Sequence, residues 1–262
     1  SIDLRSKVLD ISFSNVSFSY NSGVNVVNDI SFNVPQGLKM CLIGRSGSGK
    51  STLIKLLTGL YQYDSGDITI ANSSLELLNL KTLRSHIYCV PQESHFVGGT
   101  IEDNIRYGWN ECTSSQLENA LQMACYPEVI STKLGMNYPV NEGGANFSGG
   151  QKQRLALARM IIRKPKVIVL DEATSALDSI TEKNVIQNII KYCPGSSIIM
   201  ITHRVKTSKM FDNVVLLKNG IIIAQGNFEK LSTSNQEFKE PVVYLKIFHK
   251  YRFDKIKNIW SY

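Results

Sequence analysis

Two kinds of hydrophobic spacing alternate along the chain. Apolar residues fill roughly every second position in residues 11–20 and 30–34, which predicts two strands before the turn sequence Pro35-Gln36-Gly37. The short apolar segment 39–43 predicts another strand, and a glycine-rich segment follows it at once. Leucine and isoleucine then recur at helical spacing over residues 53–60. The predicted order here is strand, glycine loop and helix.

Continuous apolar runs mark the second half of the chain. A helical pattern over residues 155–162 precedes the run Val167–Leu170, and a similar run spans Ile198–Ile201. Such runs are typical of parallel strands that are covered on both faces. Two further runs around Lys218-Asn219-Gly220 predict a hairpin. Strands that alternate with helices predict an α/β fold with a mixed, mainly parallel sheet and an N-terminal antiparallel β subdomain.

The middle of the chain has a different pattern. Residues 93–150 are more polar, and the segment 115–130 has helical spacing, so we expect an inserted helical subdomain. One domain is thus predicted over residues 1–240, with a core and β subdomain made of 1–92 and 151–240. Residues 241–262 form a C-terminal tail of aromatic residues and lysines, whose role the sequence leaves open.

Composition is that of an ordinary globular protein. The 262 residues are 43% hydrophobic, which excludes a disordered or collagen-like chain. Apolar runs do not exceed four residues, against the ~20 needed to span a membrane. The net charge of +7 permits an anionic partner, although a basic solvated surface explains it equally simply. Five cysteines without a CxxC pair fit reduced thiols in the cytosol better than a metal or disulfide framework.

The glycine-rich segment fits the phosphate-binding loop pattern GxxxxGK[ST]. Its glycines allow several backbone N–H groups to converge on one anion, and the following helix adds the positive end of its dipole. Lys50 is expected to bridge the β- and γ-phosphates, and the Ser51 hydroxyl to bind Mg²⁺. The nucleotide-binding candidates here are Gly44, Arg45, Ser46, Gly47, Ser48, Gly49, Lys50, Ser51 and Thr52.

Asp171 and Glu172 end the predicted strand at Val167–Leu170. Ligands of α/β sheets bind at the carboxyl ends of the strands, so Asp171 is a candidate Mg²⁺ ligand through water. Glu172 is a candidate general base for the attacking water. An acidic pair after a strand is more often a helix cap, but the phosphate loop upstream favours the metal interpretation.

Three single residues are weaker candidates. His203 follows the strand 198–201 and could bond the γ-phosphate or align Glu172 and water. Gln92 could reach the metal with its amide oxygen, and Tyr20 could stack on a base. A polar strand cap, a loop glutamine and a surface tyrosine are the respective alternatives.

Phe147-Ser148-Gly149-Gly150-Gln151 predicts a second anion site. Ser148 is typical of a helix N-cap, and the two glycines leave backbone N–H groups accessible at the helix start. One phosphate loop already accounts for one nucleotide, so the second site is expected to serve a neighbouring subunit. A capped helix after a flexible turn is the alternative.

Together these segments resemble the nucleotide-binding domain of an ATP-binding cassette (ABC) transporter. Residues 44–52 match Walker A, Gln92 the Q-loop, 147–151 the signature, and Asp171 with Glu172 Walker B and its catalytic glutamate. The resemblance also places Tyr20 on adenine, Asp178 in the D-loop and His203 as the switch histidine. Ser148, Gly149, Gly150 and Gln151 are then expected to contact ATP that is bound by the partner.

The family resemblance implies ATP and Mg²⁺ as ligands and a head-to-tail homodimer around two ATP molecules. The sequence around Gly98–Ile105 and Glu142-Gly143-Gly144 is similar to exporters, most of all bacterial exporters of bacteriocins, lantibiotics and double-glycine peptides. Such a domain works at the cytoplasmic face of the membrane, beside a transmembrane domain expected in the same full-length chain. The resemblance implies that the exported peptide is an indirect partner, that nucleic acid is none, and that the fragment itself is soluble. Both sites of the dimer are expected to hydrolyse ATP.

Two other functions fit parts of the sequence. A non-transport ABC ATPase acting on nucleic acid or ribosomes would suit the positive charge. However, ~120 residues between Lys50 and Asp171 leave no room for a long coiled coil, and the chain carries one cassette. A regulatory nucleotide-binding module without turnover would not need Glu172 and His203.

Overall fold

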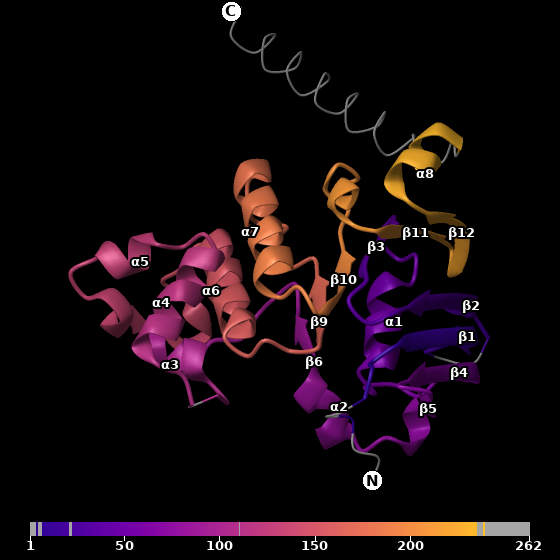
Figure 1. Cartoon of the computed structure of the whole chain (residues 1–262), viewed down its shortest axis with the longest axis horizontal. Helices are drawn as coiled ribbons and strands as arrows, with labels where there is room; N and C mark the ends of the chain where they lie inside the picture. Colours follow the sequence, from indigo (N-terminus) through magenta and orange to yellow (C-terminus); the bar gives the residue numbers. More distant parts are fainter. Residues whose placement is uncertain (1–3, 5–6, 21–22, 110, 235–237, 239–262) are drawn as a thin grey trace, which may run out of the picture.

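A six-stranded sheet forms the centre of the computed structural model (Figure 1), which describes residues 4, 7–20, 23–109, 111–234 and 238. Its order is β12–β11–β3–β10–β9–β6. Five strands run parallel, and β12 pairs antiparallel with β11 as a hairpin. The strands are β3 (Lys39–Gly44), β6 (Ile87–Val90), β9 (Val167–Asp171), β10 (Ser197–Ile201), β11 (Asn213–Lys218) and β12 (Ile221–Gly226). The predicted mixed, mainly parallel sheet is confirmed.

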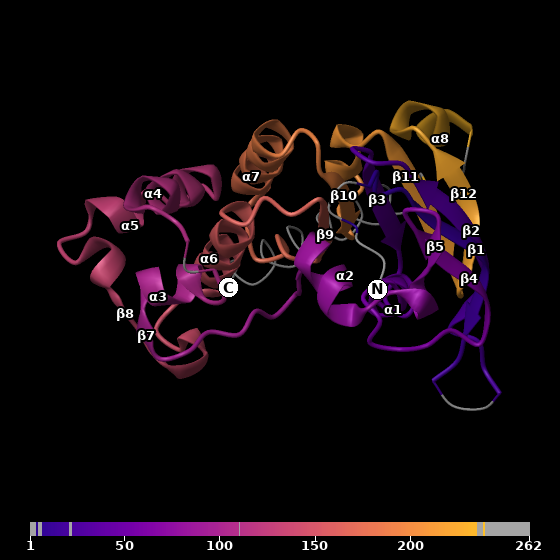
Figure 2. The same ribbon diagram turned by 60° about the horizontal axis from the view of Figure 1, so that its bottom comes forward.

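Both faces of this sheet are covered, which explains the continuous apolar runs. In β3, Cys41 and Ile43 face a core shared with α6 (Gly149–Ile161) and α7 (Ser179–Tyr192). Met40 and Leu42 face a second core shared with α1 (Lys50–Leu57). Helices α1 and α6 therefore lie on opposite faces of the sheet, as Figures 1 and 2 also show.

A second, antiparallel sheet packs on the side of α1 and has the order β2–β1–β4–β5. Its strands are β1 (Ile11–Phe18), β2 (Val27–Val34), β4 (Ser65–Ile70) and β5 (Ser73–Ser74). The predicted N-terminal β subdomain is thus present. The alternation shifts between Phe13 and Val16 because Asn15, with φ 50°, forms part of an irregularity in the β1–β2 register.

The helical part lies at the left of Figure 1, where α3 (Ile101–Arg106) and α4 (Ser114–Met123) pack on α6. The helix predicted over 115–130 is in fact two helices, α4 and α5 (Glu128–Ser131). Cys125, with φ 54°, and Pro127, which lacks an N–H group, interrupt it. The remaining elements are α2 (Leu80–His86), α8 (Phe228–Ser234), β7 (Gly99–Thr100), β8 (Pro139–Val140) and the 3₁₀ turns at Leu75–Leu77, Gly135–Asn137, Glu142–Gly144 and Thr207–Met210.

Two expectations differ from the structure or lie beyond it. Helix α1 ends at Leu57, and Leu60 is exposed after Gly59, whose φ of 65° ends the helix. The C-terminal tail 241–262 lies outside the described residues. Within the described ranges, no helix has both the length and the apolar character needed to cross a membrane.

Candidate active site

The phosphate-binding loop connects β3 to α1 and depends on its glycines. Gly49 has φ 100°, and a Cβ there would lie 2.7 Å from the Val26 carbonyl oxygen. A Cβ at Gly44 would lie 2.4 Å from the Leu217 carbonyl oxygen. Residues 44–49 therefore form a tight turn, and helix α1 begins directly after it at Lys50.

The Lys50 ammonium group is folded into this loop. Its Nζ donates hydrogen bonds to the carbonyl oxygens of Gly44 (2.9 Å) and Arg45 (2.8 Å), and to Ser48 Oγ (3.3 Å). Burial lowers the pKa of Lys50, while Glu172 and Asp171 act in the opposite direction. A buried cation among backbone dipoles suits an anionic ligand such as a phosphate.

Ser51 and Asp171 meet across the gap between α1 and β9. Ser51 Oγ donates to Asp171 Oδ1 at 3.0 Å. Burial raises the pKa of Asp171, and this hydroxyl contact partly offsets the increase. A hydroxyl and a carboxylate oxygen at this spacing are the hard donors that Mg²⁺ prefers. The two residues therefore fit a magnesium site, and their binding of the metal stays a prediction.

Glu172 and His203 follow two neighbouring strands, β9 and β10, and form a pair. His203 Nε2 lies 2.6 Å from Glu172 Oε1. The other ring nitrogen, Nδ1, lies 3.1 Å from the Gly44 carbonyl oxygen. The histidine thus joins the candidate base to the phosphate loop.

Tyr20 lies beside the start of α1. Its hydroxyl is 3.1 Å from Thr52 Oγ1, and its ring meets the Tyr61 ring edge-on with centroids 5.2 Å apart. The Lys55 Nζ lies 5.5 Å from the Tyr20 ring centroid. Tyr20 is 42% exposed, so the residue is accessible from solvent.

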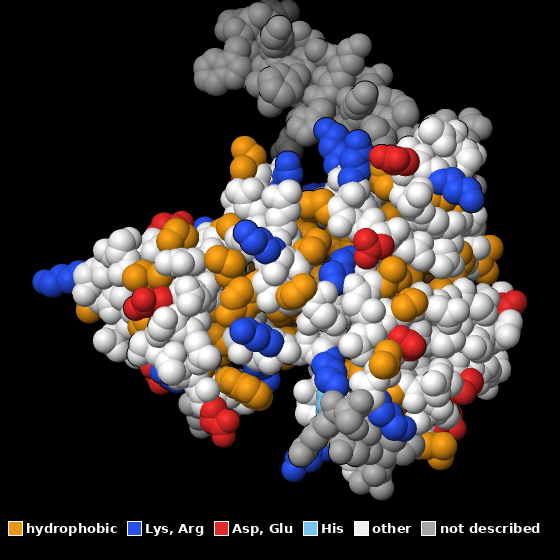
Figure 3. Space-filling view, viewed as in Figure 1, with side chains coloured by type: hydrophobic (Ala, Val, Ile, Leu, Met, Phe, Trp, Pro, Cys, Tyr) orange, Lys and Arg blue, Asp and Glu red, His pale blue; other side chains and the backbone are white. Residues whose placement is uncertain are grey.

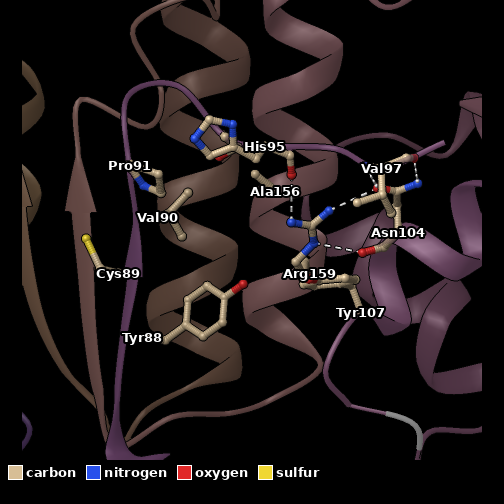
Figure 4. A pocket seen from close by; sticks show the side chains of 11 residues that line it. Tyr88, Cys89, Val90, Pro91, His95, Val97, Asn104, Tyr107, Ala156 and Arg159 are labelled. Atoms are coloured by element: carbon tan, nitrogen blue, oxygen red, sulfur yellow. Dashed lines mark hydrogen bonds between the residues drawn. The ribbon is translucent and has the colours of Figure 1, made fainter. Parts of the chain in front are cut away.

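Gln92 is exposed in the segment after β6, and no hydrogen bond links it to Ser51 or Asp171 among the described residues. Its role as a metal ligand stays a prediction. The same segment borders a pocket of about 250 Å³ (Figure 4). Arg159 crosses this pocket, donating from Nε to the Asn104 carbonyl oxygen (2.7 Å) and from Nη1 to the His95 carbonyl oxygen (3.0 Å).

The second predicted anion site lies at the start of α6. Ser148 is the N-cap: its Oγ accepts from the Gln151 N–H, and its own N–H donates to Gln151 Oε1. A Cβ at Gly149 would lie 3.3 Å from Ala176 Cβ, and one at Gly150 lies 3.3 Å from the Ala176 carbonyl oxygen. Within the described part of the chain, no hydrogen bond joins 148–151 to the phosphate loop.

Asp178 serves as the N-cap of α7. Its Oδ1 accepts from the N–H groups of Ile180 (2.9 Å) and Thr181 (3.0 Å), and Thr181 Oγ1 donates to Oδ2 (2.6 Å). The hydrogen bonds from Thr181 keep the pKa of Asp178 below its usual range. Asp178 is therefore an exposed cap and not a member of the phosphate-loop cluster.

Sequence reasoning missed three polar residues beside the site. Gln153 Nε2 donates to Ser175 Oγ (3.0 Å), and Gln153 Oε1 accepts from the Ala176 N–H (2.9 Å). Glu182 Oε2 and Arg204 Nη1 form an ion pair at 2.8 Å, and Arg204 also contacts the loop that contains Ser175. The sequence offered two signals for these residues. Gln153 is an amide on the buried face of α6, and Glu182 is an acid in the first turn of α7.

Comparisons with known proteins agree with these observations. A family model described as ABC transporter matches residues 27–175. The chain is 40% identical over 222 residues to ATP-binding cassette sub-family B member 6 of Xenopus tropicalis, covering 84% of this chain and 26% of that protein. It is also 40% identical over 225 residues to the Lactococcin-G-processing and transport ATP-binding protein LagD of Lactococcus lactis subsp. lactis, covering 85% and 32% respectively.

A solved structure shares the fold as well. The structure of a bacterial Atm1-family ABC exporter with ATP bound is similar with a TM-score of 0.87 and 29% sequence identity. The similarity covers 93% of this chain and 44% of that chain. The chain spans 26% of one of the two relatives above and 32% of the other.

Proposed function

Since the chain belongs to the ABC transporter family and forms an ATPase domain of that family, we propose that it powers an exporter by hydrolysing ATP in a head-to-tail dimer. The observation that supports this proposal most strongly is that two pairs of polar side chains lie beside the phosphate-binding loop. Ser51–Asp171 and Glu172–His203 both lie where the carboxyl ends of β3, β9 and β10 meet.

The phosphate loop supplies binding. Its N–H groups and Lys50 hold the β- and γ-phosphates, and Tyr20 stacks on the base. Ser51, Asp171 and Gln92 would hold Mg²⁺, which when bound neutralises phosphate charge. Gln92 is exposed in the segment that follows β6, which leaves its amide accessible to a ligand.

Glu172 and His203 supply the chemistry. Glu172 accepts a proton from the water that attacks the γ-phosphate, and His203 orients the carboxylate and contacts the phosphate. Their contact at 2.6 Å supports a joint role.

Ser148 acts on ATP held by the partner subunit. It is exposed at the start of α6, and α6 lies across the sheet from α1. Gly149, Gly150 and Gln151 accompany it, and Asp178 lies on the loop packed against these glycines. Two-fold pairing of two chains would place each Ser148 at the other chain's loop.

The conformational change that accompanies ATP hydrolysis would be transmitted to a membrane-embedded domain. This domain would dock at the pocket around Arg159. This pocket borders the segment of Gln92, so ATP binding and docking share one element. Peptide export, of a bacteriocin or lantibiotic, is supported by the similarity to LagD. On the face shown in Figure 3, Lys and Arg are scattered rather than gathered into one stripe, which disfavours a nucleic acid partner there.

Glu172→Gln tests the proposed function. The variant should bind ATP as tightly as the wild type but lose turnover by at least ~100-fold, because Gln cannot accept the proton. Light scattering should show its mass double when Mg-ATP is added. Normal turnover would refute the base assignment, and a monomer with ATP bound would refute dimerisation of this chain alone.

A further inference from the structure

Glu182 is a charged side chain that lies almost fully inside the protein. Its side chain is 3% exposed, in the first turn of α7, on a face that otherwise buries Val185 and Ile189. A carboxylate in such a place loses its hydration, and the free-energy cost of this loss must be offset by hydrogen bonds within the protein. Apolar side chains would fill the same space without this desolvation, so the charge points to a role beyond packing.

Each oxygen of the Glu182 carboxylate holds a different segment. Oε1 accepts from Thr174 Oγ1 at 2.7 Å, and Thr174 lies two residues after Glu172. Oε2 accepts from Arg204 Nη1 at 2.8 Å, and Arg204 directly follows His203. One carboxylate therefore joins the two segments that carry the proposed catalytic pair.

Arg204 extends this link with its second terminal nitrogen. Nη2 donates to the carbonyl oxygens of Ser175 (3.1 Å) and Leu177 (2.8 Å). Thr207 Oγ1 donates to Glu182 Oε2 at 3.0 Å and fixes the far side of the same segment. Only a planar guanidinium group presents donors in the fork that this arrangement uses.

We propose that Glu182 and Arg204 are positioning residues for Glu172 and His203. This inference rests on the proposed function, in which the latter two act on the attacking water. Neither positioning residue touches the reacting atoms; both fix the backbone from which the reacting side chains extend. A misplacement of about 1 Å in such a site reduces the rate by up to about 100-fold.

Arg204→Met is the first test. We expect kcat to fall by about 10- to 100-fold while KM for ATP stays within about twofold, because the phosphate loop and Tyr20 are untouched. Arg204→Lys keeps a charge near Glu182 but lacks the fork, so it should recover only part of kcat. Arg106→Met is the matched control, since Arg106 pairs with Glu102 at 2.7 Å in α3. It should leave both constants unchanged.

Loss of stability must be separated from loss of position. Arg204→Met leaves the Glu182 charge buried without its cation, whereas the double variant Glu182→Gln/Arg204→Met removes both charges. We expect thermal unfolding to show recovered stability in the double variant, with kcat still low. A folded double variant with wild-type kcat would overturn the inference, and so would a rise in KM without a fall in kcat.

The same assays distinguish this inference from the proposed function. A wild-type chain that does not hydrolyse Mg-ATP at any concentration refutes the proposed function itself. A wild-type chain that hydrolyses ATP beside an equally active Arg204→Met variant refutes only the positioning role.

Discussion

At the scale of single residues, the site residue Asp171 works against the stability of the fold. Burial raises the pKa of its carboxyl group, and the nearby Glu172 acts in the same direction. The folded chain therefore binds this proton more tightly than the unfolded chain does. Stability is lost as the pH rises from about 4, the ordinary aspartate value, through the raised pKa, and the loss is complete above it.

Asp171→Asn removes this ionised carboxylate. We predict a higher thermal midpoint than the wild type at pH 7 without nucleotide, a difference that disappears near pH 4. Hydrolysis of Mg-ATP should be lost at the same time. Differential scanning calorimetry across this pH range measures the first effect, and phosphate release measures the second.

Asp178→Asn is the control with the opposite sign. Hydrogen bonds hold the pKa of Asp178 low, so its ionised form adds stability above the unfolded value and this is lost as the pH falls. The variant should therefore have a lower midpoint than the wild type at pH 7. A lower midpoint for Asp171→Asn as well would contradict the account of the buried carboxylate.

Lys50→Ala tests the proposed phosphate clamp. It removes the ammonium group that the loop carbonyls of Gly44 and Arg45 now hold. We predict at least a tenfold weaker affinity for ATP, measured by titration calorimetry, because the loop keeps its N–H groups but loses the charge. An unchanged affinity would show that Lys50 does not contact phosphate.

At the scale of elements, the N-termini of α4 and α6 have the same type of helix cap but differ in proposed role. Ser148 with Gln151 caps α6, and Thr113 with Gln116 caps α4 in the same capping box. Removing either cap should cost about 1 kcal/mol of stability. In a chain of this size that corresponds to a fall of about 2–4 °C in thermal midpoint.

Ser148→Ala and Thr113→Ala therefore form a matched pair. We predict similar small losses of stability in both, but a loss of ATP hydrolysis by at least tenfold only in Ser148→Ala. ATP binding should persist in both, since each chain keeps its own phosphate loop. Equal activities would mean that Ser148 is only a helix cap.

Elements were predictable from the sequence where their cause is local. The apolar run Val167–Leu170 and the glycines of the phosphate loop each define their own structure, and both appear as predicted. The break in the helix was missed although Pro127 is a sequence signal for it, whereas the positive φ of Cys125 has no clear sequence signal. The link between Glu182 and Arg204 was missed because it joins side chains 22 residues apart.

At the scale of the whole molecule, each chain carries one phosphate loop and one exposed Ser148, on helices that lie across the sheet from each other. The proposed composite site of two chains has a direct consequence for mixtures. A chain that lacks Lys50 can still contribute its Ser148 to the site on the partner chain. A chain that lacks Ser148 can still bind ATP with its own phosphate loop.

Mixing Lys50→Ala with Ser148→Ala is the corresponding prediction. Each variant alone should be nearly inactive, whereas an equal mixture should recover up to roughly a quarter of wild-type activity, because half of the dimers have one intact site. Steady-state phosphate release at high protein concentration measures this. A mixture no more active than its components would place Ser148 outside the site.

The contact of His203 with both Glu172 and the Gly44 carbonyl oxygen links two parts of the site through one side chain. A phosphate bound at the loop would compete with these two groups for the ring nitrogens of His203. Movement of this ring would then change the position of the Glu172 carboxylate. The filling of the phosphate loop and the placement of the proposed base are therefore coupled through a single imidazole ring.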